Sequence, residues 1–215
     1  MFRTSARLIV CIGLILSLAT LTTSSVQRSS RPNASSHLTL MGFTLEKNTL
    51  TDVQNKLGTS NTGGCSEDVE ASKMICYVSE GPGKTRVFFE SGSAGGWSRL
   101  DGFKVVSGDF ALTCRLTCKA TTTFAGDVQT DGGLKLGLNQ RELVALLGPP
   151  SKVKGDRLIF QWQSERSMTK AEVDKATKTS KTPIASPHWD VQDTIDVLLS
   201  ESKVVEFEIH HTVTD

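Results

Sequence analysis

The sequence predicts an α+β protein with two tandem repeats, each a short helix packed on an antiparallel three- to four-stranded sheet. The first observation is that residues 138–150 (LNQRELVALLGPP) have a shorter echo at residues 48–58 (NTLTDVQNKLG). The second is that each segment precedes strand-like stretches, in which residues 85–91 (TRVFFES) align with residues 194–200 (TIDVLLS). A repeat of this kind decides the predicted fold, because each copy is one structural unit that packs against the other.

The predicted domain plan follows from these repeats and from the length of the chain. The first repeat spans residues 38–107 and the second spans residues 134–215. Between them lies the inter-repeat segment 108–133, which contains Cys114 and Cys118. A chain of 215 residues has room for one ordinary domain or two very small ones. We therefore expect both copies to share a single core.

The N-terminus has the pattern of a secretory signal peptide, assigned to residues 1–25. Two arginines precede the apolar run at residues 8–21, and the small polar stretch TTSS follows as a cleavage region. The run is shorter than the roughly 20 apolar residues that cross a bilayer. The alternative is a membrane anchor through residues 8–21. Residues 26–37 show no periodicity and are predicted to be a flexible leader.

Each repeat is predicted to begin with a helix that has its own start and stop signals. A capping box starts the helix, an apolar stripe follows, and a glycine ends it. Two to three turns are not stable alone in water, so each stripe must lie on a sheet. In the second copy the capping box is Asn139 with Glu142, the apolar stripe includes Leu143 and Leu147, and the terminal glycine is Gly148. In the first copy the same roles belong to Thr49 with Asp52, to Val53 and Leu57, and to Gly58.

The strands are predicted from alternation of apolar and polar residues. In the last strand Val205, Phe207 and Ile209 are expected to face the core, opposite Glu206, Glu208 and His210. Trp162 shares the apolar face of its strand and is expected in the core. Together the three strands of the second copy form an antiparallel meander, and the first copy has strands at about residues 73–79, 84–91 and 98–106.

A long insertion, residues 164–189, separates the first two strands of the second copy. Thr169 and Glu172 form another capping box, which predicts a short charged helix at about residues 170–178. The remainder is predicted to be a loop. Such an excursion is either a binding element or a tolerated insertion.

Four cysteines remain after the signal peptide, and export favours disulfide bonds among them. Sequence alone allows three pairings of Cys65, Cys76, Cys114 and Cys118. We favour Cys65 with Cys76 and Cys114 with Cys118. The second pair needs a turn or a helical bend, because residues four apart in a straight strand lie roughly 13 Å apart, too far for a bond.

The sequence predicts no enzyme, no cofactor and no metal. There is no serine elbow, HExxH motif or phosphate-binding glycine loop. His210 and His211 are adjacent on a strand, so they point to opposite faces and are poor joint ligands. A hydrolase or metal enzyme would require His188, His210 and an acidic side chain to converge. A net charge of +1 also gives no indication of nucleic-acid binding.

Candidate partner contacts are four residues on loops or on the predicted wet face: Trp97, Trp189, Phe88 and Pro183. Aromatic side chains on loops are enriched at binding hot spots. Either tryptophan can instead fill a core edge. Phe88 faces away from its neighbours in the strand, so it belongs either to a second, helix-covered layer or to an apolar spot on the wet face.

The order of elements resembles a known family. A helix, an LG turn with a following proline and a three-stranded meander, led in by KLGLNQREL, resemble the SmpA/OmlA domain, the family of the outer-membrane assembly lipoprotein BamE. In tandem, the unit resembles the beta-lactamase inhibitor protein (BLIP-like) fold. The match covers roughly residues 38–106 and 134–213. It departs from the family in lacking a lipobox and in having Thr59 where the second copy has Pro149.

The resemblance implies a non-enzymatic, extracytoplasmic protein, periplasmic or secreted, that presents sheet faces and loops to an unidentified protein partner. The alternative is an assembly or structural factor of the cell envelope. No partner-contacting residue of the family transfers to this chain, because the match covers only scaffold positions. Neither the oligomeric state nor the identity of the partner follows from the sequence.

Overall fold

The structure is a computed structural model that describes residues 34–63, 72–81, 83–92, 98–108, 116–125, 127–180 and 187–214. The predicted signal peptide lies outside the described residues. So do four predicted site residues, Cys65, Cys114, Trp97 and Pro183. Within the described part, the fold is mixed α+β with a mostly antiparallel sheet, as the sequence predicts.

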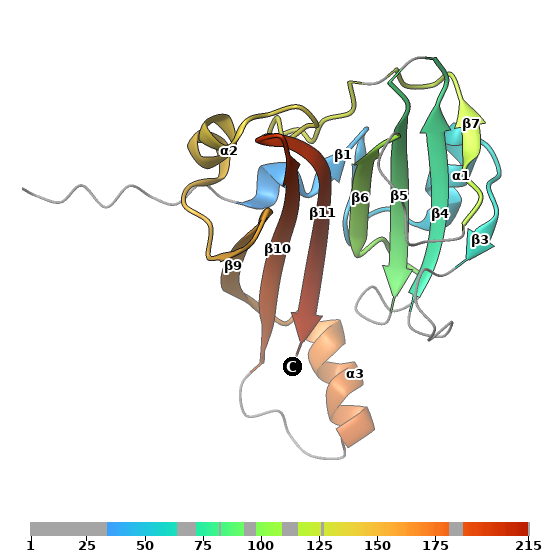
Figure 1. The fold of residues 1–215 in the computed structure, drawn as a ribbon. Coiled ribbons are helices and arrows are strands. Elements are labelled where there is room, and N and C mark those ends of the chain that lie inside the picture. The colour runs from blue at the N-terminus through green and yellow to red at the C-terminus, as the bar shows by residue number, and fades with distance from the viewer. Residues whose placement is uncertain are drawn as a thin grey trace, which may run out of the picture. The chain divides into compact units, whose positions relative to one another are not determined.

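The main element is a nine-stranded sheet, and its path is β3-β4-β5-β6-β11-β10-β9-β8 (Figure 1). Strand β7 lies off this path and pairs in parallel with β4, whereas the other pairs are antiparallel. The strands are β3 (Thr62–Gly63), β4 (Ser72–Ser79), β5 (Thr85–Gly92), β6 (Gly102–Ser107), β7 (Lys119–Thr121), β8 (Lys152–Lys154), β9 (Arg157–Ser167), β10 (His188–Ser200) and β11 (Lys203–Thr214). A separate hairpin consists of β1 (Thr39–Leu40) and β2 (Phe43–Thr44).

The prediction that each copy has its own sheet is wrong, because β6 and β11 pair with each other. Phe207 lies opposite Val105 and Ile209 opposite Phe103, so the two sets of strands form one continuous sheet. Each of these strands ends a meander and would otherwise leave a row of unpaired backbone N–H and C=O groups at an edge. The pairing of β6 with β11 gives hydrogen-bond partners to the backbone groups of both edges.

Helices α1 (Leu50–Leu57) and α2 (Gln140–Leu147) confirm the predicted capping boxes. The Asp52 amide donates to Thr49 Oγ1 at 3.1 Å, and the Glu142 amide donates to Asn139 Oδ1 at 3.0 Å. Both helices end at a glycine with positive φ, Gly58 and Gly148. Their apolar stripes, Val53 with Leu57 and Leu143 with Leu147, are buried.

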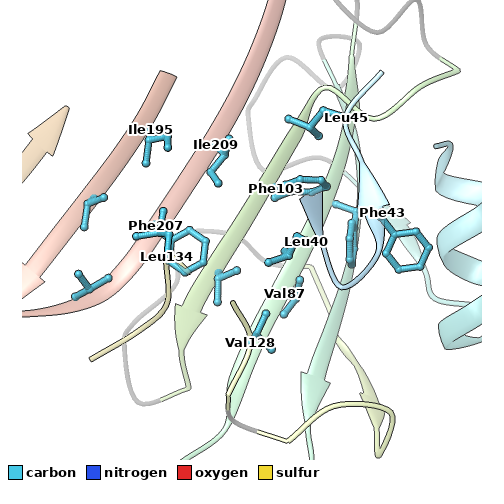
Figure 2. Close-up of a cluster of buried hydrophobic side chains, with 14 of the residues drawn as sticks. Leu40, Phe43, Leu45, Val87, Phe103, Val128, Leu134, Ile195, Phe207 and Ile209 are labelled. Atoms are coloured by element: carbon cyan, nitrogen blue, oxygen red, sulfur yellow. The ribbon is translucent and has the colours of Figure 1, made fainter. Parts of the chain in front are cut away.

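One hydrophobic core covers one face of the sheet on both sides of the β6–β11 junction. Figure 2 shows Phe43 and Leu40 of the hairpin near Phe103 of β6, with Phe207 and Ile209 of β11 beyond. Phe89 lies in this core too, and its ring makes edge-to-face contacts with Phe43 and Phe103. The core is therefore continuous across the junction.

The opposite face of β4, β5 and β6 carries a second, smaller cluster. Met74, Cys76, Phe88 and Val106 are buried there beneath Leu116 and Cys118. Phe88 is 1% exposed, so its assignment as a partner contact is wrong. It lies in a second covered layer, but Leu116 and Cys118 cover that layer instead of the predicted helix.

The disulfide bond joins Cys76 to Cys118, with the two Cα atoms 4.5 Å apart. The favoured pairs Cys65–Cys76 and Cys114–Cys118 are therefore wrong. The reason is that β7 pairs with β4, opposing Lys119 to Tyr77, and this brings the preceding Cys118 beside Cys76. Local spacing along the sequence gives no sign of that long-range pairing.

Four local predictions also need correction. The last part of the flexible leader forms a 3-10 helix, Ala34–His37, because the buried His37 ring bonds Thr130 Oγ1 at 3.0 Å. Strand β6 begins at Gly102 rather than near residue 98, since the Leu100 amide donates to Asn48 O instead.

A register shift at Leu198 and Leu199 buries Val204 in place of Val205. Trp162 is only partly buried at the core margin.

The insertion contains helix α3 (Lys170–Ser180), which confirms the predicted helix. Glu172 bonds the Thr169 amide at 2.7 Å and both terminal nitrogens of Arg166, at 2.8 and 3.1 Å. Arg166 belongs to the end of β9, so this carboxylate attaches the start of α3 to the sheet.

Candidate functional site

The candidate site is the face of β9, β10, β11 and β6 that points away from the main core, here called the open face. Alternation and register place mostly polar side chains along it, and all but one of these side chains are exposed or half-buried. The open face comprises Arg157, Ile159, Gln161 and Gln163 of β9, Gln192, Thr194, Asp196 and Leu198 of β10, Glu206, Glu208, His210 and Thr212 of β11, and Lys104 of β6; of these Glu206 alone is buried.

A connected set of ion pairs crosses the open face. Arg157 contacts Asp196 at 3.0 Å and Glu206 at 3.1 Å, measured from guanidinium nitrogen to carboxylate oxygen. Lys104 Nζ lies 3.2 Å from Glu206 Oε1 and 3.3 Å from Glu208 Oε2. Because Lys104 is on β6 and its partners are on β11, the ion pairs bridge the junction in the sheet.

The same contacts keep these groups charged. Burial raises the pKa of Glu208, but hydrogen bonds and charge from His210 and Lys104 outweigh it and bring the pKa to about 2. Burial lowers the pKa of Lys104, and the Glu208 and Glu206 carboxylates raise it above its usual value. The centre of the open face is thus a charged region at any pH near neutrality.

Glu90, Glu208 and His210 form a compact cluster at one end of this network. Glu90 on β5, Gly102 on β6 and His210 on β11 lie in one row across three strands. Gly102 has no side chain, so the outer two side chains can approach each other above it. One donor atom from each of the three residues lies within 4.8 Å of the others, and His210 Nε2 is 2.7 Å from Glu208 Oε1.

Sequence reasoning missed this cluster, although part of its signal was visible. Glu208 and His210 are two residues apart on one strand and therefore share a face. Glu90 joins them only through the pairing of β5, β6 and β11, which the sequence does not reveal. Gly102 inside a strand was the remaining signal, since a strand glycine often marks a close approach by other groups.

His211 points to the opposite face, as predicted for adjacent histidines on a strand. Its Nδ1 lies 2.6 Å from Asp193 Oδ1 and its Nε2 lies 3.2 Å from Glu46 Oε2. Burial lowers the pKa of His211, and the two carboxylates more than offset this and raise it. Both ring nitrogens are engaged, so His211 acts as a cationic link between the sheet and the segment before α1.

The remaining predicted site residues are not brought together in the described part of the chain. Trp189 is half-buried, with the Arg166 guanidinium 6.0 Å from its ring centre. His188 is exposed and pairs with Ser167, whereas His210 lies opposite Thr194, six residues further along β10. The convergence of His188 with His210 that a hydrolase would require is therefore absent from this arrangement.

Three further features belong to the described residues. None of the helices there combines the length and apolarity needed to traverse a bilayer. The Cys76–Cys118 disulfide is compatible with a place outside the cytoplasm. A polar hollow of about 350 Å³ lies at the far end of the open face, between Gln163, Glu165 and Gln192.

Comparisons with models of protein families, with curated proteins and with solved structures gave no match for this chain.

Proposed function

We propose that this chain is an exported, non-enzymatic protein-binding module, inhibitor- or scaffold-like, which presents its open face and the α3 insertion to a protein partner. The observation that carries the proposal is the asymmetry of the sheet. One face is covered by helices, hairpin and core, while β9, β10 and β11 expose polar side chains on the other.

We further propose that the chain contains two tandem copies of one unit. The strand order supports this, because β3-β4-β5-β6 is mirrored by β8-β9-β10-β11 about the central β6–β11 pair. Helices α1 and α2 precede their strands with the same capping box and the same terminal glycine. Duplication with antiparallel association of the last strands accounts for both regularities.

The chemistry of the open face suits a macromolecule better than a small molecule. Gln161, Gln163 and Gln192 are exposed and supply both donors and acceptors without adding charge. Small-molecule sites are usually concave and mostly apolar, whereas protein interfaces tolerate wide polar surfaces with bridging water. A broad strand surface of this kind matches a protein interface better than a small-molecule site.

The test is affinity capture of the mature chain from its native envelope, with mass spectrometry of co-purifying proteins. The exposed residues Gln161 and Gln192 are each changed to arginine, and Gln140→Arg on α2 is the matched control with the same change of charge. We expect one partner to be recovered with the wild type and with Gln140→Arg, and to be reduced at least about tenfold by the two open-face variants.

Equal recovery with all variants would refute binding through the open face. A partner that belongs to a membrane-embedded assembly complex would favour the alternative, a cell-envelope assembly or structural factor. Failure to recover any specific protein would contradict both forms of the proposal.

A further inference from the structure

We propose that Glu90, Glu208 and His210 form a binding site for a divalent transition-metal ion, with Zn²⁺ as the best match to the donor set. This inference does not depend on the proposed protein-binding function. Imidazole nitrogen and carboxylate oxygen are both zinc ligands, and three protein ligands leave a further coordination position for water or another group. All three side chains are half-buried, which limits competition from bulk water.

The backbone positions the three ligands before any ion binds. Glu90 and His210 face each other across Gly102, and Glu208 is two residues from His210 on the same side of β11. A β-carbon at Gly102 would lie 3.0 Å from His210 Nδ1 and 3.4 Å from Glu90 Cβ. Glycine therefore keeps open the space in which the two side chains meet.

The donor atoms are already close to the spacing that zinc requires. Ligand atoms in a tetrahedral zinc site lie about 3.3 Å apart, given bonds of about 2.0 Å. His210 Nε2 and Glu208 Oε1 are 2.7 Å apart, and every donor of the trio is within 4.8 Å of the others. An ion would replace the proton between Nε2 and Oε1, releasing it to solvent, with small movements of the side chains.

Lys104 assists this arrangement rather than blocking it. Its ammonium contacts Oε2 of Glu208, while His210 contacts Oε1. Lys104 thus holds Oε2 of Glu208 in place and orients Oε1 toward the site, as outer-shell groups do around metal ligands.

The local charge also favours a dication. Five carboxylates in and beside the network, those of Glu90, Asp101, Asp196, Glu206 and Glu208, accompany two permanent cations, Lys104 and Arg157. Negative charge therefore remains when His210 is neutral. A divalent ion bound to the neutral imidazole offsets two of these charges, whereas a protonated His210 offsets only one.

The test is calorimetric titration of the full mature chain, freed of metal with a chelator, with Zn²⁺ at neutral pH. We expect one equivalent to bind, with Kd in the micromolar range or tighter. His210→Gln and Glu90→Gln should each weaken binding at least about tenfold. His188→Gln, which removes an exposed histidine from β10, is the matched control and should leave binding unchanged.

A second measurement remains decisive where a variant folds poorly. Imidazole nitrogen resonances of the wild-type chain, recorded with and without one equivalent of Zn²⁺, should move for His210 and stay in place for His188 and His211. Absence of saturable binding up to millimolar zinc would overturn the proposal. Binding that survives His210→Gln, or that shifts only the other histidines, would overturn it equally.

Discussion

Tyr77 illustrates how one buried side chain ties two elements together. Its hydroxyl donates to the carbonyl of Gly58 at 2.7 Å, connecting β4 to the residue that ends α1. Burial raises the pKa of Tyr77 from 10.0 to about 12. The folded state therefore holds the phenolic proton more tightly than the unfolded state, and this contribution to stability is complete below pH 10.

The titration of Tyr77 is directly measurable because it is the single tyrosine of the chain. We expect the phenolate absorbance to appear with a midpoint near pH 12, accompanied by a loss of stability as the pH rises from 10 through 12. Ultraviolet difference spectra against pH, together with circular dichroism, measure both. A midpoint at pH 10 with the fold intact would contradict the buried hydrogen bond.

Gly102 lies directly beside the His210 ring, which leaves little room for a side chain at this position. We expect Gly102→Ala to destabilise the protein by about 1 to 3 kcal/mol, because the new methyl group crowds the His210 ring. Urea unfolding measures the change, and Ser164→Ala at an exposed position of β9 is the control. A neutral effect of Gly102→Ala would mean that the imidazole does not lie above β6.

At the scale of elements, local signals and long-range pairings differ in how well sequence reveals them. The capping boxes of α1, α2 and α3 involve residues three apart, so each helix was predictable from its own residues. The pairings β6–β11 and β4–β7 join segments distant in the chain and have no local signature. Both the disulfide and the Glu90 cluster depend on such pairings, which is why they escaped prediction.

The disulfide provides an element-scale prediction. Cys76 and Cys118 are 42 residues apart, so by loop entropy their bond stabilises the fold by about 4 kcal/mol. We expect the double variant Cys76→Ala, Cys118→Ala to lose about 2 to 4 kcal/mol in urea unfolding. Peptide mapping without reduction should yield a fragment that links the two cysteines. A fragment linking Cys65 to Cys76 instead would contradict the β4–β7 pairing.

Helix α3 provides a prediction about acid sensitivity. The Arg166 guanidinium and the Thr169 amide bring the pKa of Glu172 down from 4.5 to about 2. A depressed pKa means that the support for α3 is present above pH 4.5 and is lost as the pH falls through about 2. We expect Glu172→Gln to raise amide hydrogen exchange in α3 with little change in global melting temperature.

Glu165→Gln is the matched control for α3, since Glu165 is an exposed neighbour on β9. It should leave the exchange of α3 amides as in the wild type. If the two variants behave alike, the contact between Glu172 and Arg166 does not attach the helix.

At the scale of the whole molecule, the shared sheet and the shared core should make unfolding cooperative. Phe207 is fully buried at the junction, opposite Val105 of β6. We expect Phe207→Ala to cost about 3 to 5 kcal/mol and to weaken both halves together. Native-state hydrogen exchange of amides in β5 and in β10 measures this, and both sets should lose equal protection. Loss confined to β10 would show two independently unfolding units.

The central position of β11 also has a consequence for the order of events during biosynthesis. β11 is the last described strand along the chain, yet it lies between β6 and β10 in the sheet. While the chain is being synthesised, the edge of β6 stays unpaired until β11 emerges. If synthesis halts in that interval, the unpaired edge of β6 can pair with a strand of a neighbouring copy. Prompt completion of the chain therefore protects this protein against aggregation.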